Sequence, residues 1–115
     1  MANASYTAIP AGAGTYTVWL DYFTAPPNVG YAVELAAGAS GASFVVNFTM
    51  DDPDPLAGAP NVGWTPIWIA DPTNGTAKTS TVSGSYVFPI RGLQVVFTTL
   101  TGTAMFAVLQ GMSAR

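Results

Sequence analysis

The feature that most limits what this chain can fold into is a series of short strand-like runs cut by glycine and proline. Val, Thr, Ile, Tyr, Phe and Trp recur in these runs, and clusters of Gly, Pro, Asn, Asp and Ala separate them. Helix signals are absent. A chain of 115 residues suffices for one core and is too short for two. The sequence therefore predicts a single all-β domain over 1–115.

The runs predict about seven or eight strands, a number at which two antiparallel sheets can cover each other's apolar faces. We expect a jelly-roll-like β-sandwich. The expected strands are 6–9, 15–23, 31–35, 43–50, 63–70, 85–90, 93–100 and 103–110.

Local signals refine this arrangement. The run 43–50 has one strongly apolar face and is predicted to be a central strand, whereas Pro66 favours an edge position for 63–70. The segment 71–75 has Pro and Gly where a tight turn needs them. Thr101 and Gly102 suit a two-residue hairpin loop with positive φ, so we expect the last two strands to pair.

Composition limits the partners. Only 8% of the residues are charged, against roughly 25% in an average soluble domain, and half are hydrophobic. Part of the exterior is therefore expected to be covered by other proteins, including copies of the chain. Three basic residues cannot supply the footprint of a nucleic-acid or anionic-membrane partner.

The same composition argues against catalysis and cofactors. There is no His and no Cys, so the commonest general base, nitrogen ligand and thiol nucleophile are missing. We expect no enzymatic activity and no bound cofactor. The chain shows no signal peptide and no apolar run of ~20 residues, so synthesis in the cytoplasm is expected.

Three carboxylates, Asp51, Asp52 and Asp54, lie close together in a proline-rich stretch. Such a group could bind Ca²⁺, but the spacing is not that of an EF-hand and the prolines stiffen the loop. Turn capping explains the acids without a metal, so no metal site is predicted. We instead consider these three residues candidates for protein contact, because loops are common contact sites.

Aromatic residues are the other candidates. Trp64 and Trp68 share one face of the predicted strand 63–70, where they could pack in the core, contact another protein or stack on a sugar. Arg91 is a lone cation between apolar residues, and it is expected to pair with an acid or to extend to solvent. The candidate contact residues are thus Asp51, Asp52, Asp54, Trp64, Trp68 and Arg91.

Several motifs recur here in the order found in a class of small virion proteins of tailed bacteriophages, which the chain resembles over 43–111. They are Phe48, Asp51-Asp52-Pro53, Trp64, the segment 84–92 (GSYVFPIRG), Thr101-Gly102-Thr103 and Val108-Leu109-Gln110. The resemblance implies a β-sandwich subunit present in many copies on a capsid or its neck.

These observations lead to one hypothesis and two alternatives. The leading hypothesis is a capsid decoration or cement protein that binds the major capsid protein or other virion proteins on the virion surface, as a homo-oligomer. The alternatives are a neck or tail structural subunit and a carbohydrate-binding adhesin module.

Overall fold

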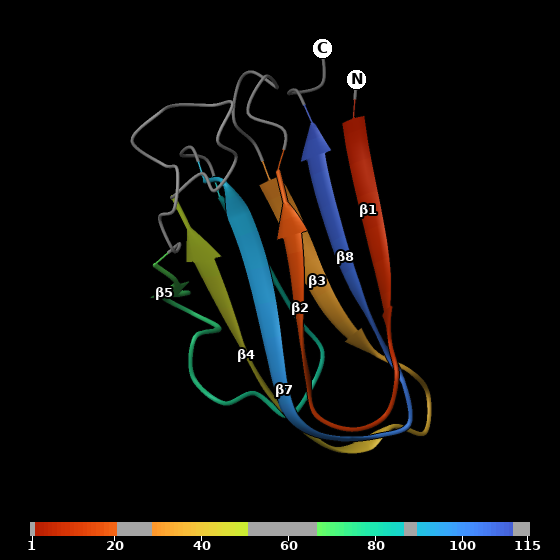
Figure 1. Cartoon of the computed structure of the whole chain (residues 1–115). Helices are drawn as coiled ribbons and strands as arrows, with labels where there is room; N and C mark the ends of the chain where they lie inside the picture. The colour runs from red at the N-terminus through yellow and green to blue at the C-terminus, as the bar shows by residue number, and fades with distance from the viewer. Residues whose placement is uncertain (1, 21–28, 51–66, 87–89, 112–115) are drawn as a thin grey trace.

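The computed structural model describes residues 2–20, 29–50, 67–86 and 90–111, which form eight strands and contain no helix (Figure 1). The strands are β1 (Ala2–Ile9), β2 (Gly14–Trp19), β3 (Val29–Leu35), β4 (Ser40–Thr49), β5 (Ile69–Ala70), β6 (Val82–Tyr86), β7 (Gly92–Thr101) and β8 (Ala104–Gly111). The all-β prediction is confirmed.

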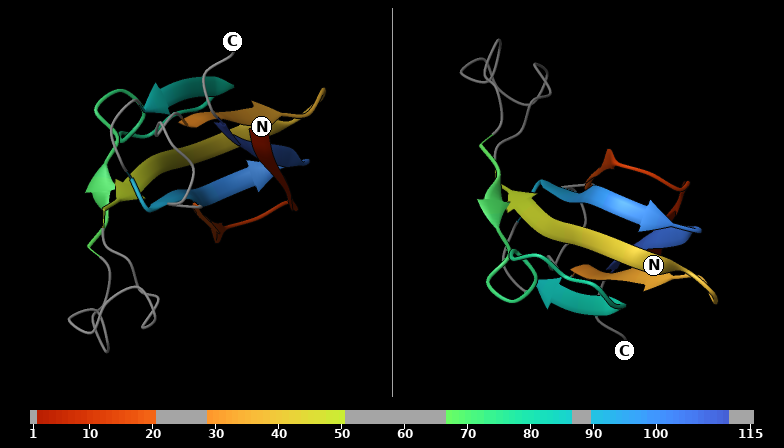
Figure 2. Two further views of the ribbon diagram at one scale, coloured as in Figure 1. Left: turned by 90° about the horizontal axis from the view of Figure 1, so that it is seen from above. Right: turned by 90° about the horizontal axis from the view of Figure 1, so that it is seen from below.

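The first four strands pair with the last four in reverse order, as in one long hairpin that has folded over on itself. β1 pairs with β8, β2 with β7, β3 with β6 and β4 with β5, all antiparallel. Pairs β3–β8 and β4–β7 complete two sheets: sheet A in the order β1-β8-β3-β6 and sheet B in the order β2-β7-β4-β5. This is the strand order of a jelly roll. Figure 2 shows the two sheets as stacked layers.

The core lies between the sheets and follows the predicted alternation. From Leu93 to Phe97 of β7 every second residue is buried, and the Phe97 ring stacks on Phe44 of β4 with 4.8 Å between centroids. Phe106 of β8 is fully buried opposite them in sheet A. Burial of each such side chain contributes about 1.5–3 kcal/mol, so these faces fix which side of each strand points inward.

The predicted hairpin at 101–102 is wrong. β7 belongs to sheet B and β8 to sheet A, so the chain crosses between the sheets at this point. Gly102 does have the expected positive φ, +98°, and lies against the Cα atom of Ala39. A Thr-Gly pair favours a reversal with positive φ, but it does not specify whether the flanking strands pair with each other.

The strand limits differ at several ends. β1 begins at Ala2 instead of residue 6, and β6 ends at Tyr86, with 87–89 outside the described residues. β4 is an inner strand, as predicted, and β5 is an edge strand of only two residues. The remainder of the predicted strand 63–70 lies largely outside the described residues, as does 21–23 of the predicted strand 15–23.

Candidate interaction surfaces

Four of the six predicted contact residues, Asp51, Asp52, Asp54 and Trp64, lie outside the described residues. Trp68 and Arg91 are described. Over the described ranges, no group of three potential metal-ligating side chains is found. The same ranges hold no helix long and apolar enough to cross a membrane.

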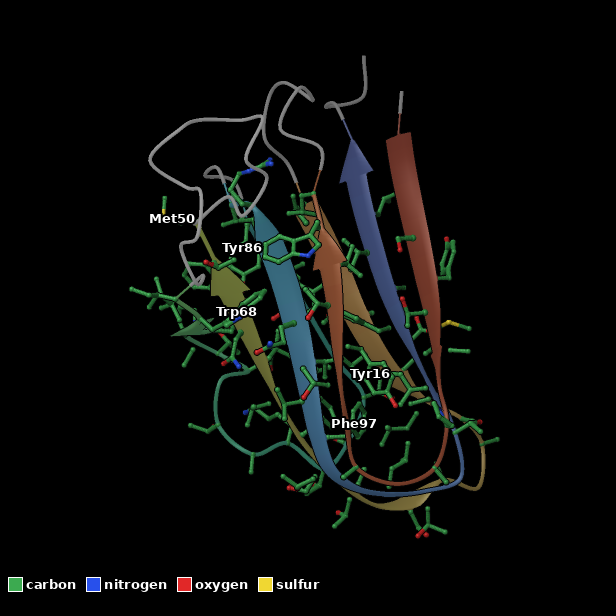
Figure 3. All side chains as sticks on the ribbon, viewed as in Figure 1. Tyr16, Met50, Trp68, Tyr86 and Phe97 are labelled. Carbon is green, nitrogen blue, oxygen red and sulfur yellow. The ribbon has the colours of Figure 1, made fainter. Side chains whose placement is uncertain are left out.

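Trp68 contacts Trp19 on the outer face of sheet B. Their ring centroids are 5.6 Å apart with 40° between the planes, and Figure 3 shows Trp68 at the β4–β5 side of that sheet. Trp19 is the register partner of Gly92, and a Cβ atom on Gly92 would lie 2.7 Å from the Trp19 ring. The missing side chain at Gly92 is therefore what lets the indole lie across β7. Trp19 remains 46% exposed.

Amide and hydroxyl groups extend the same face. Thr49 is buried and donates its hydroxyl hydrogen bond to the Ile67 carbonyl at 2.8 Å. Asn47 lies two residues before Thr49 in β4, and its side-chain amide donates a hydrogen bond to Gln94 Oε1 of β7 at 3.0 Å. On the other side of β7, Thr17 of β2 is the register partner of Gln94. None of these side chains is charged. We call Thr17, Trp19, Asn47, Trp68 and Gln94 the aromatic–amide face.

The outer face of sheet A has a different chemistry. In β1, Ser5 and Thr7 are opposite the buried Val108 and Phe106, so they point inward on the same side as the buried Ile9, and Tyr6 points outward. Tyr6 is 69% exposed, and Leu109 of β8 is 52% exposed on the same side.

Small and apolar residues fill the remainder of that face. We call the following residues the alanine face: Tyr6, Ala8, Gly30, Ala32, Glu34, Ser83, Ser85, Met105, Ala107 and Leu109. Glu34 is the one charged residue among them. The surface therefore carries mainly small and apolar side chains and a single charged residue.

A buried polar cluster connects the sheets beneath these faces. Asp71 Oδ2 accepts hydrogen bonds from the hydroxyls of Tyr31, at 2.8 Å, and Tyr86, while Asp71 Oδ1 accepts from the backbone N–H groups of Thr73 and Asn74, both at 2.8 Å. The Asn74 amide donates to Tyr31 Oη at 2.9 Å. The cluster thus fixes the predicted turn at 71–75 to β3 and β6 of sheet A.

The environment of the cluster sets its protonation. Burial favours the neutral form of Asp71, but the hydrogen bonds from Tyr86, Asn74, Thr73 and Tyr31 outweigh it and the pKa of Asp71 is lowered. Burial raises the pKa of Tyr31 to about 12, and burial together with the bond to Asp71 raises the pKa of Tyr86. These groups are inside the protein, so we assign the cluster a structural role.

Arg91 lies at one end of sheet B, next to Gly92. Its backbone N–H donates to the Thr49 carbonyl at 2.8 Å, and its carbonyl accepts from the Leu20 N–H at 2.9 Å. The guanidinium Nη1 donates to the Leu20 carbonyl at 3.1 Å. Arg91 therefore joins the ends of three segments of sheet B, and its predicted protein contact stays a prediction.

Sequence reasoning placed the N-terminal segment and its Tyr6 among the expected contact surfaces, but it missed Trp19 as the partner of Trp68 and it missed Leu109. A usable signal was present in β2, where Trp19 alternates with the inward-facing Tyr16 and Val18. In β8 the outward Met105, Ala107 and Leu109 are as apolar as the inward residues, which is typical of a strand covered on both sides.

Comparison with known proteins adds little about function. No family model matches the chain, and no curated protein matches it. Among solved structures it is similar to one described as "Bacillus endospore appendages form a novel family of disulfide-linked pili", with 13% identity, a TM-score of 0.47, and coverage of 98% of this chain and 88% of that one. The present 115 residues contain no Cys. A likeness this low carries no function from one protein to the other.

Proposed function

We propose that this protein is a structural subunit that acts by adhesion, with its alanine face buried against other proteins of an assembly. The observation that carries the proposal is that Tyr6 and Leu109 are large, apolar and more than half exposed on the outer face of sheet A, while Ser5 and Thr7 of β1 point inward. A sheet face that meets water normally carries the polar residues of each strand. Large apolar side chains on an outer face are stabilised when a partner covers that face.

Magnitudes support burial of the whole face. Covering apolar surface contributes about 25 cal/mol per Å², and two of the largest contributors, Tyr6 and Leu109, are more than half exposed in the isolated chain. The two inner strands of sheet A carry Gly30, Ala32 and Ala107 on this face. Their small side chains permit close approach of a partner protein. Many identical contacts in one assembly would multiply a modest gain per contact.

In its finer form the proposal is a decoration subunit of a tailed-bacteriophage capsid, with a neck or tail subunit as the alternative. The ordered motifs over 43–111 support it. The jelly roll also occurs in viral capsid domains, although this is an analogy of fold alone. The absence of His from the 115 residues is consistent with a purely adhesive role.

The first test is the association state. We expect the purified chain to sediment as a homo-oligomer, and Tyr6→Lys or Leu109→Lys to shift it to monomer, because a charge in the covered face must be desolvated. Both positions are exposed in the isolated chain, so the fold should be retained. Thr17→Lys, on the opposite sheet, is the matched control and should leave association unchanged.

The second test is the copy number in purified particles. Decoration requires on the order of hundreds of copies, whereas a neck or tail ring requires about six or twelve. A chain that is monomeric and absent from particles would contradict both forms of the proposal.

A further inference from the structure

A second surface remains after the alanine face is assigned to assembly. We propose that the aromatic–amide face of sheet B binds a neutral saccharide, with Trp19 as the stacking platform and the Asn47–Gln94 pair as the hydrogen-bonding group. This site lies on the opposite side of the sandwich from the alanine face, and it goes beyond the adhesive function proposed above.

The platform is held in place before any ligand arrives. One part of the Trp19 indole lies against the backbone of β7 at Gly92, and Trp68 contacts it at 5.6 Å. Trp19 is still 46% exposed, so ring surface is available to solvent. Flat aromatic rings of this kind stack on apolar faces of ligands, and a ring that is already ordered loses little conformational entropy on binding.

The polar groups stand at a suitable spacing. Asn47 and Gln94 lie two residues from Thr49 and Gly92 along their strands, a separation of about 7 Å. The bond between the two amides uses one N–H of Asn47 and one lone pair of Gln94 Oε1. The Gln94 amide also has two N–H donors and the Asn47 carbonyl has acceptor capacity. Sugar hydroxyls, which both donate and accept, match this mixed set, and the exposed Thr17 adds a further hydroxyl.

Charge selects the class of saccharide. The outward-facing residues of β2, β4 and β7 around the site, from Thr15 to Trp19, Val45 to Thr49 and Gly92 to Val96, include no acid or base. Arg91, next to Gly92, lies at the end of the sheet with its guanidinium donating to the Leu20 carbonyl. Among the described residues, the middle of the face between the three strands therefore offers a phosphorylated, sulfated or uronic-acid ligand no counter-ion. A neutral hexose or N-acetylhexosamine chain requires none.

A protein partner fits this face less well than it fits the alanine face. Protein interfaces gain most from large apolar cores that exclude water. The centre of the aromatic–amide face instead holds the side chains of Asn47, Gln94 and Thr17. The hydroxyl groups of a saccharide can form hydrogen bonds with these side chains at many angles. Failure of every sugar to bind would therefore favour a protein partner for this face and overturn the proposal.

The experiment is calorimetric titration of the full chain with three neutral hexasaccharides: β-1,4-linked glucose, α-1,4-linked glucose and β-1,4-linked N-acetylglucosamine. We expect at least one to bind, and Trp19→Ala to weaken that binding at least tenfold, equivalent to about 1.4 kcal/mol. Gln94→Ala should also weaken it, while Tyr6→Ala on the opposite sheet should bind as the parent does. Thermal melts monitored by circular dichroism verify that each variant is folded.

A second variant, which moves the Trp19 ring without removing it, keeps the test valid if the Trp19→Ala protein does not fold. Gly92→Ala keeps both indoles but places a methyl group where the Trp19 ring lies, so the ring must move and binding should weaken. The proposal is overturned if none of the three sugars binds at millimolar concentration, or if binding is the same in folded Trp19→Ala and Gly92→Ala. Sedimentation of the same samples reports assembly separately, so loss of sugar binding and loss of self-association are distinguishable.

Discussion

At the scale of single residues, the molecule separates groups that hold the fold from groups that face outward. Asp71 is the only charged side chain among the buried described residues, and it accepts four hydrogen bonds from three segments of the chain. Trp19 and Tyr6, by contrast, are large and exposed on opposite sheets. Substitutions at these two kinds of position should therefore affect different properties.

Asp71→Asn should lower stability by about 2–3 kcal/mol, because an amide cannot accept from both tyrosine hydroxyls and both backbone N–H groups as the carboxylate does. For a domain of this size the loss corresponds to a decrease in Tm of about 10 °C. Thermal denaturation at pH 7 measures it. Glu34→Gln, at an exposed carboxylate on the alanine face, is the control and should leave the Tm of the monomer nearly unchanged.

The pH dependence of the same cluster has a defined sign. The pKa of Asp71 is lower in the folded state than in the unfolded state, so its stabilisation is present above about pH 4 and is lost as the pH falls through the folded pKa. Tyr31 has its pKa raised from 10.0 to about 12, so its contribution is lost between these values as the pH rises.

We therefore expect urea midpoints of the parent protein to fall below pH 4 and above pH 10. Asp71→Asn should flatten the acid limb, and Tyr31→Phe should reduce the alkaline limb, to which Tyr86 also contributes. An acid limb of equal steepness in Asp71→Asn and the parent would show that Asp71 is not linked to folding.

At the scale of elements, the corner between β7 and β8 shows what sequence can and cannot specify. Alternation correctly gives the inward faces of both strands, since Leu93, Val95 and Phe106 are all buried. The pairing of the strands was predicted wrongly, because Thr101-Gly102 suits a hairpin and a crossing between sheets equally. The rolled-up topology is decided by contacts such as β1 with β8, between residues about a hundred positions apart, which no local pattern encodes.

The interaction surfaces follow the same rule. Trp68 was predicted as a candidate contact residue, but its contact with Trp19 depends on which strands are neighbours in sheet B. The apolar side of β1 was also hidden, because Tyr6 in a weak strand gives no indication of its direction until β8 fixes the register. Strand identity and inward faces are therefore predictable locally, whereas surfaces built from several strands are not.

Gly102→Ala tests the corner as an element. The residue has φ of +98° and its added Cβ would lie 3.0 Å from the Cα of Ala39, so substitution should cost about 1–2 kcal/mol. Gly30→Ala is the matched control: it lies within β3, has no atom within 4 Å of the added Cβ, and should be neutral or slightly stabilising. Chemical denaturation compares the two, and equal effects would contradict a special role for the corner.

At the scale of the whole molecule, the two sheets give the sandwich two outer faces of different chemistry. The alanine face is mainly apolar, and the aromatic–amide face is neutral and polar with an exposed indole. Such a subunit can be held in an assembly through one face and still present the other. The low charge of the chain, 8% of residues, applies to both.

That low charge leads to a prediction about how assembly responds to salt. If the alanine face associates through apolar burial, raising NaCl from about 0.05 to about 0.5 M should leave the association constant unchanged or strengthen it, because screening acts only on charges. An interface held by ion pairs would weaken over the same range. Sedimentation velocity across a concentration series measures the constant, and Glu34→Gln should behave as the parent. A clear weakening with salt would mean that charges outside the alanine face hold the assembly together, and the proposed interface would be wrong.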